Sequence, residues 1–266
     1  MTIWRYMDLP RFVWLLSTNR LWFAKAATFH DDPWEGFGKA KRFEIANDGL
    51  KNAATKVAKA ETGGNPQRLL SVPEMMADLS KRSSDILENA RDHLYVNSWC
   101  LASESMAMWE IYGAHGLGVA LRSTVEQFQK AERRQMDSSH YAFGQVTYHD
   151  DLETASQVDF DFRENIPLPG AGLRREVLKL GLHKRACYSY EQEWRAVLYQ
   201  DPRADIAGVD EAFDLDQLID AVYVGPRAPE FIVEVVSSIM DKYLLQKPLE
   251  KSALLSTPLI ARVEPS

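Results

Sequence analysis

The segment YSYEQEWR, residues 188–195, contains two glutamates two positions apart, and an arginine follows two positions later. Alternate side chains of a β-strand point to opposite faces of the sheet, so Glu191, Glu193 and Arg195 would share one face in a strand. That face is either an exposed, self-neutralising row of charges or the working surface of a catalytic pocket. The residue pattern by itself favours the solvated strand, because charged side chains are mostly exposed.

Several other side chains in the sequence have types that suit ligand binding. Arg5 lies within the aromatic segment WRY. A buried arginine there needs either an acidic partner or an anionic ligand, since an unpaired buried charge costs several kcal/mol, of the order of 3–5. Trp109 and Tyr112 come from a short helical segment, residues 104–112, where core packing and stacking on a planar ligand ring are both open.

The segment FHDDPWEG places three acids close together in a turn-forming sequence. Asp31, Asp32 and Glu35 could bind a divalent cation through their oxygens. An Asp-Pro turn whose acids cap backbone amides is the favoured alternative, because the further carboxylates of a hard metal site are not found nearby. The six histidines are scattered, with no pair at helical i, i+4 spacing, so a zinc enzyme is not expected and we predict no metal.

Composition and charge exclude some classes of function. The chain has 266 residues, 45% of them hydrophobic, and a formal net charge of −7. This is typical of an ordinary globular protein, and the negative charge argues against broad binding to nucleic acid backbones. Cys100 and Cys187 are too few for a disulfide framework. Neither a signal peptide nor a membrane-spanning apolar run is found, so we expect a cytoplasmic protein without a membrane partner.

The elements that must position these residues are short strands and unevenly spaced helices. Strands are predicted near residues 3–6, 94–101, 117–122, 193–199 and 220–225. Asp8 can cap a helix whose inner face holds Phe12, Leu15 and Leu16, and Ser123 and Glu126 have the spacing of a capping box. No linker separates two cores. The sequence therefore predicts a single α+β domain, residues 1–266, with a helical region inserted at about residues 40–95.

Four blocks of the sequence resemble a known bacterial family. They are IWRYMDLPRFVWLLSTNRLWFAKAATFHDDPWEG, NSWCLASESMAMWEIYGAHGLGVALRS, HKRACYSYEQEWRAVLY and IDAVYVGP. The family is the bacterial domain of unknown function numbered 2971, and the likeness extends over nearly the whole chain. Its name implies no biochemical activity.

The opening strand, helix and LWFAKA strand are also similar to the start of ADP-ribosyltransferase-like folds, which have a mixed β core. Those enzymes carry an arginine on the first strand, a serine on a central strand and a Glu-x-Glu near a later one, and Arg5, Ser98 and Glu191-Gln192-Glu193 occur here in that order. The likeness implies that Glu193 binds the nicotinamide ribose and that Glu191 faces the acceptor. It also implies that Arg5 anchors NAD and that Ser98 supports the site. Asp32 is added to the predicted binding set because its loop follows the second strand and functional sites favour loops, and Trp109 and Tyr112 because they could stack on a planar ring. The predicted NAD-binding set therefore comprises Arg5, Tyr6, Ser98, Asp32, Trp109 and Tyr112. The serine block reads SWC instead of Ser-Thr-Ser, so the role of Ser98 is the weakest part of this likeness.

By this likeness the protein would transfer ADP-ribose from NAD to an unknown macromolecular acceptor, or hydrolyse NAD, in toxin or phage-defence biology. The carboxylates suit that chemistry, because cleavage of the nicotinamide–ribose bond passes through an oxocarbenium-like centre. A non-catalytic binding module with a structural Arg5–Glu193 pair is one alternative. A metal-dependent hydrolase or nuclease built on Asp31, Asp32 and Glu35 is another. The sequence does not indicate the oligomeric state.

Overall fold

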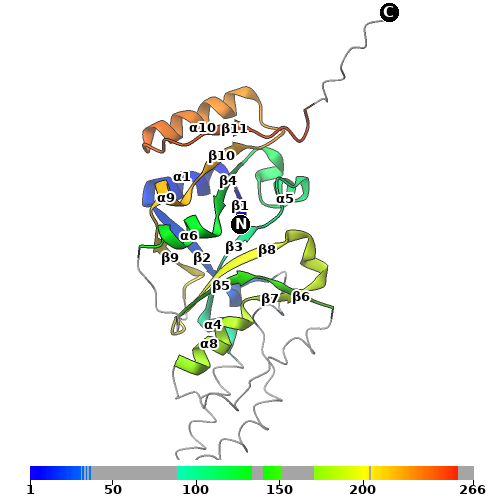
Figure 1. The fold of residues 1–266 in the computed structure, drawn as a ribbon, viewed down its shortest axis with the longest axis vertical. Helices are drawn as coiled ribbons and strands as arrows, with labels where there is room; N and C mark the ends of the chain where they lie inside the picture. Colours follow the sequence, from blue (N-terminus) through cyan, green and yellow to red (C-terminus); the bar gives the residue numbers. More distant parts are fainter. Residues whose placement is uncertain are drawn as a thin grey trace, which may run out of the picture. The chain divides into compact units, whose positions relative to one another are not determined.

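The chain forms a large mixed β-sheet with short helices between its strands (Figure 1). The structure is a computed structural model, and it describes residues 1–30, 32, 34, 36, 89–133, 140–150, 171–203 and 205–256. The contacts divide the chain into two compact units. Unit 1 comprises Met1–Leu21, Trp99–Arg134 and Ala212–Ser266, and unit 2 comprises Trp22–Ser98 and Gln135–Glu211.

The strands of the described residues are β1 (Thr2–Met7), β2 (Arg20–Lys25), β3 (Leu94–Cys100), β4 (Val119–Thr124), β5 (Tyr141–Gln145), β6 (Thr147–His149), β7 (His183–Arg185), β8 (Glu193–Tyr199), β9 (Gly208–Ala212), β10 (Ala221–Val224) and β11 (Leu249–Lys251). The α-helices are α1 (Leu9–Thr18), α4 (Ala90–His93), α5 (Met106–Ile111), α6 (Val125–Ala131), α8 (Ala171–Leu180), α9 (Leu215–Leu218) and α10 (Glu230–Lys242). The 3₁₀ turns are η1 (Ala26–Thr28), η2 (Ala114–Gly116) and η3 (Ala186–Glu191).

Unit 1 is built on the strand order β11-β10-β4-β1. β1 pairs antiparallel with β4 and β4 pairs antiparallel with β10, whereas β10 and β11 are parallel. The register aligns Tyr6 with Ala120, and Ala120 with Tyr223, so these three side chains share one face of the sheet. They form an apolar cluster together with Trp109 of α5. Within this unit, Figure 1 shows α5 on one side of the strands and α1, α6 and α9 on the other.

The first helix forms as its sequence predicts. The Asp8 side chain accepts a hydrogen bond from the Arg11 backbone N–H at 2.8 Å, and Phe12, Leu15 and Leu16 are buried. The predicted capping box at Ser123 is displaced by one residue, because Thr124 caps α6 by accepting from the Gln127 N–H at 3.1 Å. Ser123 is instead the buried penultimate residue of β4, and its hydroxyl donates to the Leu218 carbonyl.

Unit 2 contains the strand pairs that carry the acidic motif. β8 is flanked by β3 and β5, and β5 pairs with it antiparallel from Tyr141↔Leu198 to Gln145↔Trp194. Helix α8 packs on this sheet through Val177 and Leu178, which join Val197 in one hydrophobic cluster. β6 and β7 form a separate parallel pair. All seven residues of β8 are buried, so a solvated charge row on this strand is wrong.

The five predicted strands are confirmed as β1, β3, β4, β8 and β10. The predicted helical insertion lies outside the described residues, apart from the part after residue 88, where α4 is found. The single-domain assignment stays a prediction.

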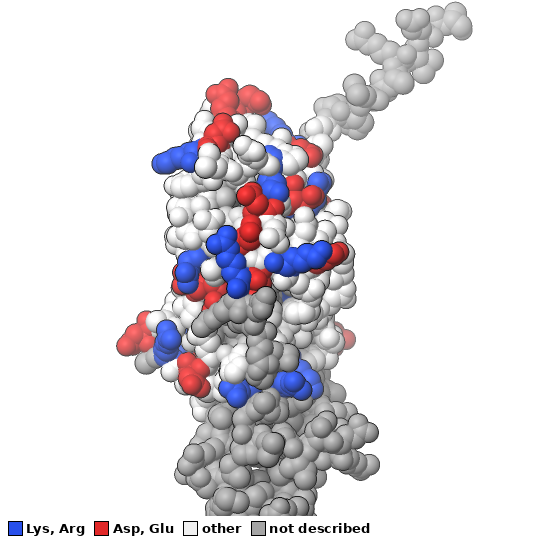
Figure 2. All heavy atoms as spheres, turned by 60° about the vertical axis from the view of Figure 1, so that its left-hand side comes forward, with Lys and Arg blue, Asp and Glu red and all other residues white. Residues whose placement is uncertain are grey.

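Among the described residues, no helix combines the length and apolar character needed to span a membrane. Figure 2 shows acidic and basic side chains interspersed on the face it presents.

Candidate functional site

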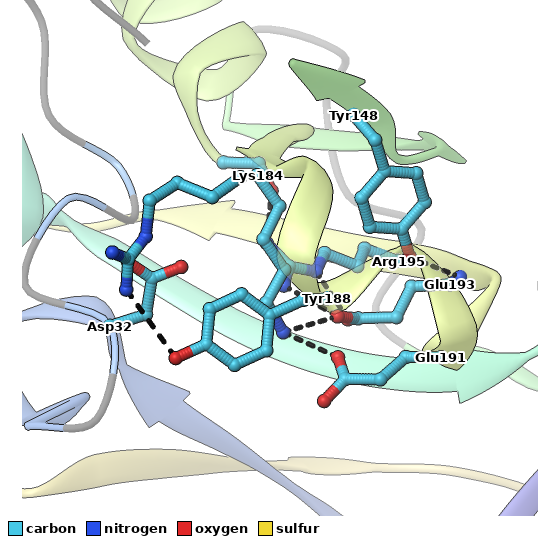
Figure 3. Close-up of polar contacts among 9 residues, drawn as sticks. Asp32, Tyr148, Lys184, Tyr188, Glu191, Glu193 and Arg195 are labelled. Atoms are coloured by element: carbon cyan, nitrogen blue, oxygen red, sulfur yellow. Dashed lines mark hydrogen bonds and ion pairs between the residues drawn. The ribbon is translucent and has the colours of Figure 1, made fainter. Parts of the chain in front are cut away.

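Four charged side chains of unit 2 form a buried cluster. Lys184 comes from β7, Glu191 ends the turn η3, and Glu193 and Arg195 come from the start of β8. The exposed fractions of these four side chains lie between 1% and 8%. Buried charges of this kind need partners, because the protein interior solvates an isolated ion poorly. The four side chains are each other's partners (Figure 3).

Arg195 and Glu193 form a two-point ion pair. Arg195 Nε donates to Glu193 Oε2 at 2.6 Å, and Arg195 Nη2 donates to Glu193 Oε1 at 2.9 Å. The guanidinium also donates from Nη1 to the Gly181 carbonyl at 2.9 Å. The two residues are two positions apart on β8, so the predicted sharing of one strand face is confirmed for this pair. This geometry fixes the Glu193 carboxylate.

Lys184 connects the two glutamates. Its Nζ donates to Glu193 Oε1 at 2.7 Å and also donates to Glu191 Oε2. The same ammonium lies 4.5 Å from the centre of the Tyr188 ring, which is a cation–π distance. Figure 3 shows Lys184 extending from β7 toward both carboxyl groups, with the Tyr188 ring beside it. The two carboxyl groups are therefore held together through one shared cation.

Glu191 does not lie on the strand that its spacing from Glu193 predicts. Residues Ala186–Glu191 form the turn η3, and β8 begins only at Glu193. Between them, Gln192 has φ 43° and ψ 57°, which is left-handed backbone. The expectation that strand alternation places Glu191 and Glu193 on one face is wrong, because this residue breaks the alternation. Their common bond to Lys184 brings them together instead.

The two glutamates differ strongly in proton affinity. Burial raises the pKa of Glu191 to about 7, and hydrogen bonding to Glu193 and the negative charge of Glu193 add to that effect. Burial is the largest single influence on Glu193 and acts to raise its pKa, but the Arg195 charge, the hydrogen bonds to Glu191 and Arg195, and the Lys184 charge together outweigh it. The pKa of Glu193 is consequently well below its usual range. One carboxyl group stays ionised while the other titrates near neutral pH.

Tyr148 of β6 supports the start of β8 from the side. Its hydroxyl oxygen accepts a hydrogen bond from the Glu193 backbone N–H at 2.8 Å. Burial is the main reason why the pKa of Tyr148 is raised to about 12, so the phenol stays neutral at physiological pH. Tyr148 therefore fixes the backbone of Glu193 without adding charge to the cluster.

Asp32 is buried in a second ion pair of the same unit. Arg185 Nε donates to Asp32 Oδ1 at 2.9 Å, and the Trp34 N–H donates to the same oxygen at 3.3 Å. In the second contact, the Asp32 side chain accepts from a backbone N–H two residues later in the chain, as in the predicted turn. Asp32 Oδ2 is buried and has no hydrogen-bond partner among the described residues.

A metal site at FHDDPWEG receives no support from the part of the chain that the structure describes. Asp31 and Glu35 lie outside the described residues, and Asp32 is engaged by Arg185. Within the described ranges, no group of three His, Cys, Asp or Glu side chains could bind a metal ion.

Arg5 and Tyr6 point to opposite faces of β1, as neighbours on a strand must. The Arg5 guanidinium lies 6.0 Å from the centre of the Trp99 ring. Burial, with a contribution from the positive charge of Arg11, lowers the pKa of Arg5 to about 10. Tyr6 lies in the apolar cluster of the other face, and its hydroxyl accepts from the Ser105 N–H at 3.1 Å. The two residues therefore do not line one surface of unit 1.

The two aromatic residues of the α5 segment differ in exposure. Trp109 is fully buried and packs edge-on against Tyr6, with ring centroids 4.9 Å apart. Its indole N–H donates to Glu104 at 3.2 Å. These contacts favour core packing over stacking on a ligand. Tyr112, which caps the end of α5, is 39% exposed.

The remaining site residues of the sequence prediction are divided between the units. Ser98 is half-buried on β3 and belongs to unit 2 with Glu191 and Glu193, whereas Arg5, Tyr6, Trp109 and Tyr112 belong to unit 1. Convergence of Arg5, Ser98 and Glu193 in one site stays a prediction. Sequence reasoning missed Lys184. The sequence signal for Lys184 is a lysine in the short HKR segment, a few residues before the acidic pair. A lysine at this spacing is not distinctive unless the fold is known.

Comparisons with known proteins show a partial match of this chain to a family of unknown function. A search of curated proteins and a search of solved structures each found no match, so the likeness to ADP-ribosyltransferase-like folds stays a prediction. Residues 108–196 match the model of the family described as "Protein of unknown function (DUF2971)", and this stretch contains all four residues of the buried charged cluster.

Proposed function

We propose that the protein cleaves NAD at the nicotinamide–ribose bond and transfers ADP-ribose to a macromolecule or to water, with Glu191 and Glu193 as its carboxyl pair. One observation carries the proposal. The environments of two adjacent carboxyl groups hold their pKa values far apart, with Glu193 well below the usual range and Glu191 near 7. Such separation is characteristic of paired acids that divide catalytic roles.

Glu193 is proposed as the electrostatic stabiliser. It remains ionised at neutral pH, and a fixed negative charge favours the positive charge that develops on the ribose as the bond to nicotinamide breaks. Its orientation by the Arg195 fork means that little reorganisation is needed at the moment of reaction.

Glu191 is proposed as the proton acceptor. As an oxygen or nitrogen of the acceptor forms its bond to ribose C1′, the bond from C1′ to nicotinamide breaks, and neutral nicotinamide leaves with the bonding electron pair. The proton of the attacking group moves to the Glu191 carboxylate. A base with a pKa near 7 is well matched to this step at neutral pH.

Binding of NAD is assigned to the residues predicted for it from the sequence. The pyrophosphate needs a fixed cation, and Arg5 is the proposed one. Asp32 Oδ2 is buried and has no hydrogen-bond partner within the described part of the chain, which supports a role for that residue because this oxygen can accept a hydrogen bond from a ligand hydroxyl. The exposed ring of Tyr112 suits stacking better than the buried ring of Trp109. Ser98 keeps its supporting role in this proposal, with phage defence or toxin action as the biological setting.

A non-catalytic binding module is the second candidate. It is favoured because the Glu193 carboxylate already accepts hydrogen bonds at both of its oxygens. In addition, less than a tenth of each cluster side chain is exposed. In that case the cluster would be a structural ion-pair network. Catalysis requires that the turn η3, whose Ser189 and Tyr190 are exposed, moves to admit NAD.

The test is nicotinamide release from NAD by the wild type, Glu193→Gln and Glu191→Gln, alongside calorimetric titration with NAD. We expect Glu193→Gln to bind NAD but to lose roughly 100-fold or more in turnover, because the substitution removes the stabilising charge and keeps the shape. Glu126→Gln changes an exposed glutamate in unit 1 and should retain full turnover. A wild type that neither binds NAD nor releases nicotinamide, with Glu193→Gln lowering only the melting temperature, would establish the structural network.

A further inference from the structure

Lys184 is placed to act on the proton balance of the carboxyl pair. Its ammonium group contacts a carboxylate oxygen of Glu193 at 2.7 Å and a carboxylate oxygen of Glu191. It approaches from β7, whereas the two glutamates come from η3 and β8. A single side chain thus fastens the end of the turn to the start of the strand.

We propose that Lys184 is a positioning residue: its ammonium group holds Glu191 beside Glu193 and determines the pH range in which Glu191 is ionised and can accept a proton. The inference rests on the proposed function for its catalytic meaning. The ionisation of Glu191 is nevertheless a property that can be measured in the absence of NAD.

The bonding pattern of the cluster separates the tasks of its two cations. Arg195 uses its guanidinium on both oxygens of Glu193 and on the Gly181 carbonyl. Lys184 bonds to the Glu191 carboxylate directly. An opposite charge at hydrogen-bond distance favours the ionised form of a carboxyl group, and the effect is large where water is excluded. Lys184 therefore offsets the burial and the negative charge of Glu193 that act against ionisation of Glu191.

The other groups around Glu191 do not replace this contribution. The titratable and charged side chains of the surrounding elements are His183, Lys184 and Arg185 from β7, Glu193, Arg195 and Tyr199 from β8, Cys187, Tyr188 and Tyr190 from η3, and Tyr148 and His149 from β6. Of these, Arg185 is paired with Asp32, and His149 and His183 are hydrogen-bonded to each other. Burial raises the pKa of Tyr148 and of Tyr190, so both phenols stay neutral at physiological pH. The Tyr188 ring lies against the Lys184 ammonium and favours its charged form.

The experiment follows the Glu191 carboxyl carbon by NMR during a pH titration of protein labelled with ¹³C-glutamate. The signal is assigned by its loss in Glu191→Gln. In Lys184→Met we expect the midpoint of the Glu191 titration to move to higher pH by about one to three units, because the opposing charge has been removed. The pH profile of nicotinamide release should move in the same direction by a similar amount.

Two further substitutions of Lys184 keep the test decisive if Lys184→Met folds poorly. Lys184→Gln keeps a hydrogen-bond donor and removes the charge, so it should show the same alkaline shift. Lys184→Arg keeps the charge and should restore a midpoint near that of the wild type. Lys130→Met removes an exposed lysine that pairs with Glu126 in unit 1, and it should leave the Glu191 midpoint unchanged.

The outcomes distinguish this inference from the proposed function. An unchanged Glu191 midpoint in a folded Lys184→Met or Lys184→Gln variant overturns the role of Lys184, whether or not the protein consumes NAD. An alkaline shift in a protein that releases no nicotinamide supports Lys184 as the residue that sets the ionisation of Glu191 and overturns the NAD reaction.

Discussion

Ion pairs of the same length occur in both units of this protein, in very different surroundings. In unit 1, Arg122 Nε lies 2.7 Å from Asp220 and Lys130 Nζ lies 2.7 Å from Glu126. In unit 2, Lys184 Nζ lies 2.7 Å from Glu193. In each pair of unit 1, the exposed fractions of the two side chains average more than one third. In the Lys184–Glu193 pair, both side chains are almost completely buried.

The comparison shows that distance alone does not determine what an ion pair does. Water screens the exposed pairs of unit 1, so each contributes little to stability. The core of that unit depends instead on aromatic packing, such as the contact between Trp4 and Tyr223. The buried charges of unit 2 cannot exchange their partners for water. Each therefore depends on the others for its ionisation state, and their pKa values are strongly perturbed.

The largest expected effect is loss of one cation from the buried cluster. Arg195→Met should lower the free energy of unfolding by about 3–5 kcal/mol, because Glu193 would lose its main partner inside the protein. Arg122→Met is the matched change at an exposed pair and should cost about 1 kcal/mol or less. Urea unfolding followed by circular dichroism measures both variants. Equal losses in the two would mean that the cluster of unit 2 is hydrated in solution.

The second effect is a dependence of stability on pH. The pKa of Glu191 is raised by burial to about 7 from its ordinary value of 4.5, so the folded state binds this proton more tightly than the unfolded state. Its contribution is present in full below pH 4.5 and is lost as the pH rises to about 7, amounting to up to about 3 kcal/mol. Glu193 acts in the opposite sense: its lowered pKa contributes stability above about pH 4.5 that is lost in acid.

Glu191→Gln isolates the first of these contributions. The buried His93 and the half-buried His183, whose pKa values are lowered mainly by burial, titrate over part of the same range in the parent protein. The difference in unfolding free energy between parent and variant should therefore fall steadily from pH 4.5 to pH 7. A difference that does not change with pH would show that Glu191 has an ordinary pKa.

The smallest effect is expected at the exposed pair of α6. Lys130→Met should leave the melting temperature unchanged within error, because Lys130 and Glu126 are both well solvated. An increase in salt concentration should also leave the melting temperature unchanged, because this exposed pair is already screened. Differential scanning calorimetry at two salt concentrations tests this. A clear drop in melting temperature would place surface charge among the main stabilising factors of unit 1.

Local sequence rules were sufficient for many of the secondary-structure elements. Asp8 and the spacing of Phe12, Leu15 and Leu16 predict α1, because capping and one apolar face are local properties. The β-prone segments at β1, β3, β4, β8 and β10 were predicted for the same reason. The displaced cap at Thr124 shows the limit of such rules. Ser123 donates instead to the carbonyl of Leu218, a residue far away in the chain.

The candidate site divides along the same line. The sequence by itself determined that Glu193 and Arg195 share a strand face, because side-chain alternation depends only on backbone geometry. It could not determine that Gln192 would adopt a left-handed conformation and end that alternation before Glu191. Nor could it show that Lys184 would reach both carboxyl groups from another strand, or that water would be excluded around them. Tertiary packing decided these features, because burial and contacts between separate elements set the pKa of an acid more than its neighbours in the chain do.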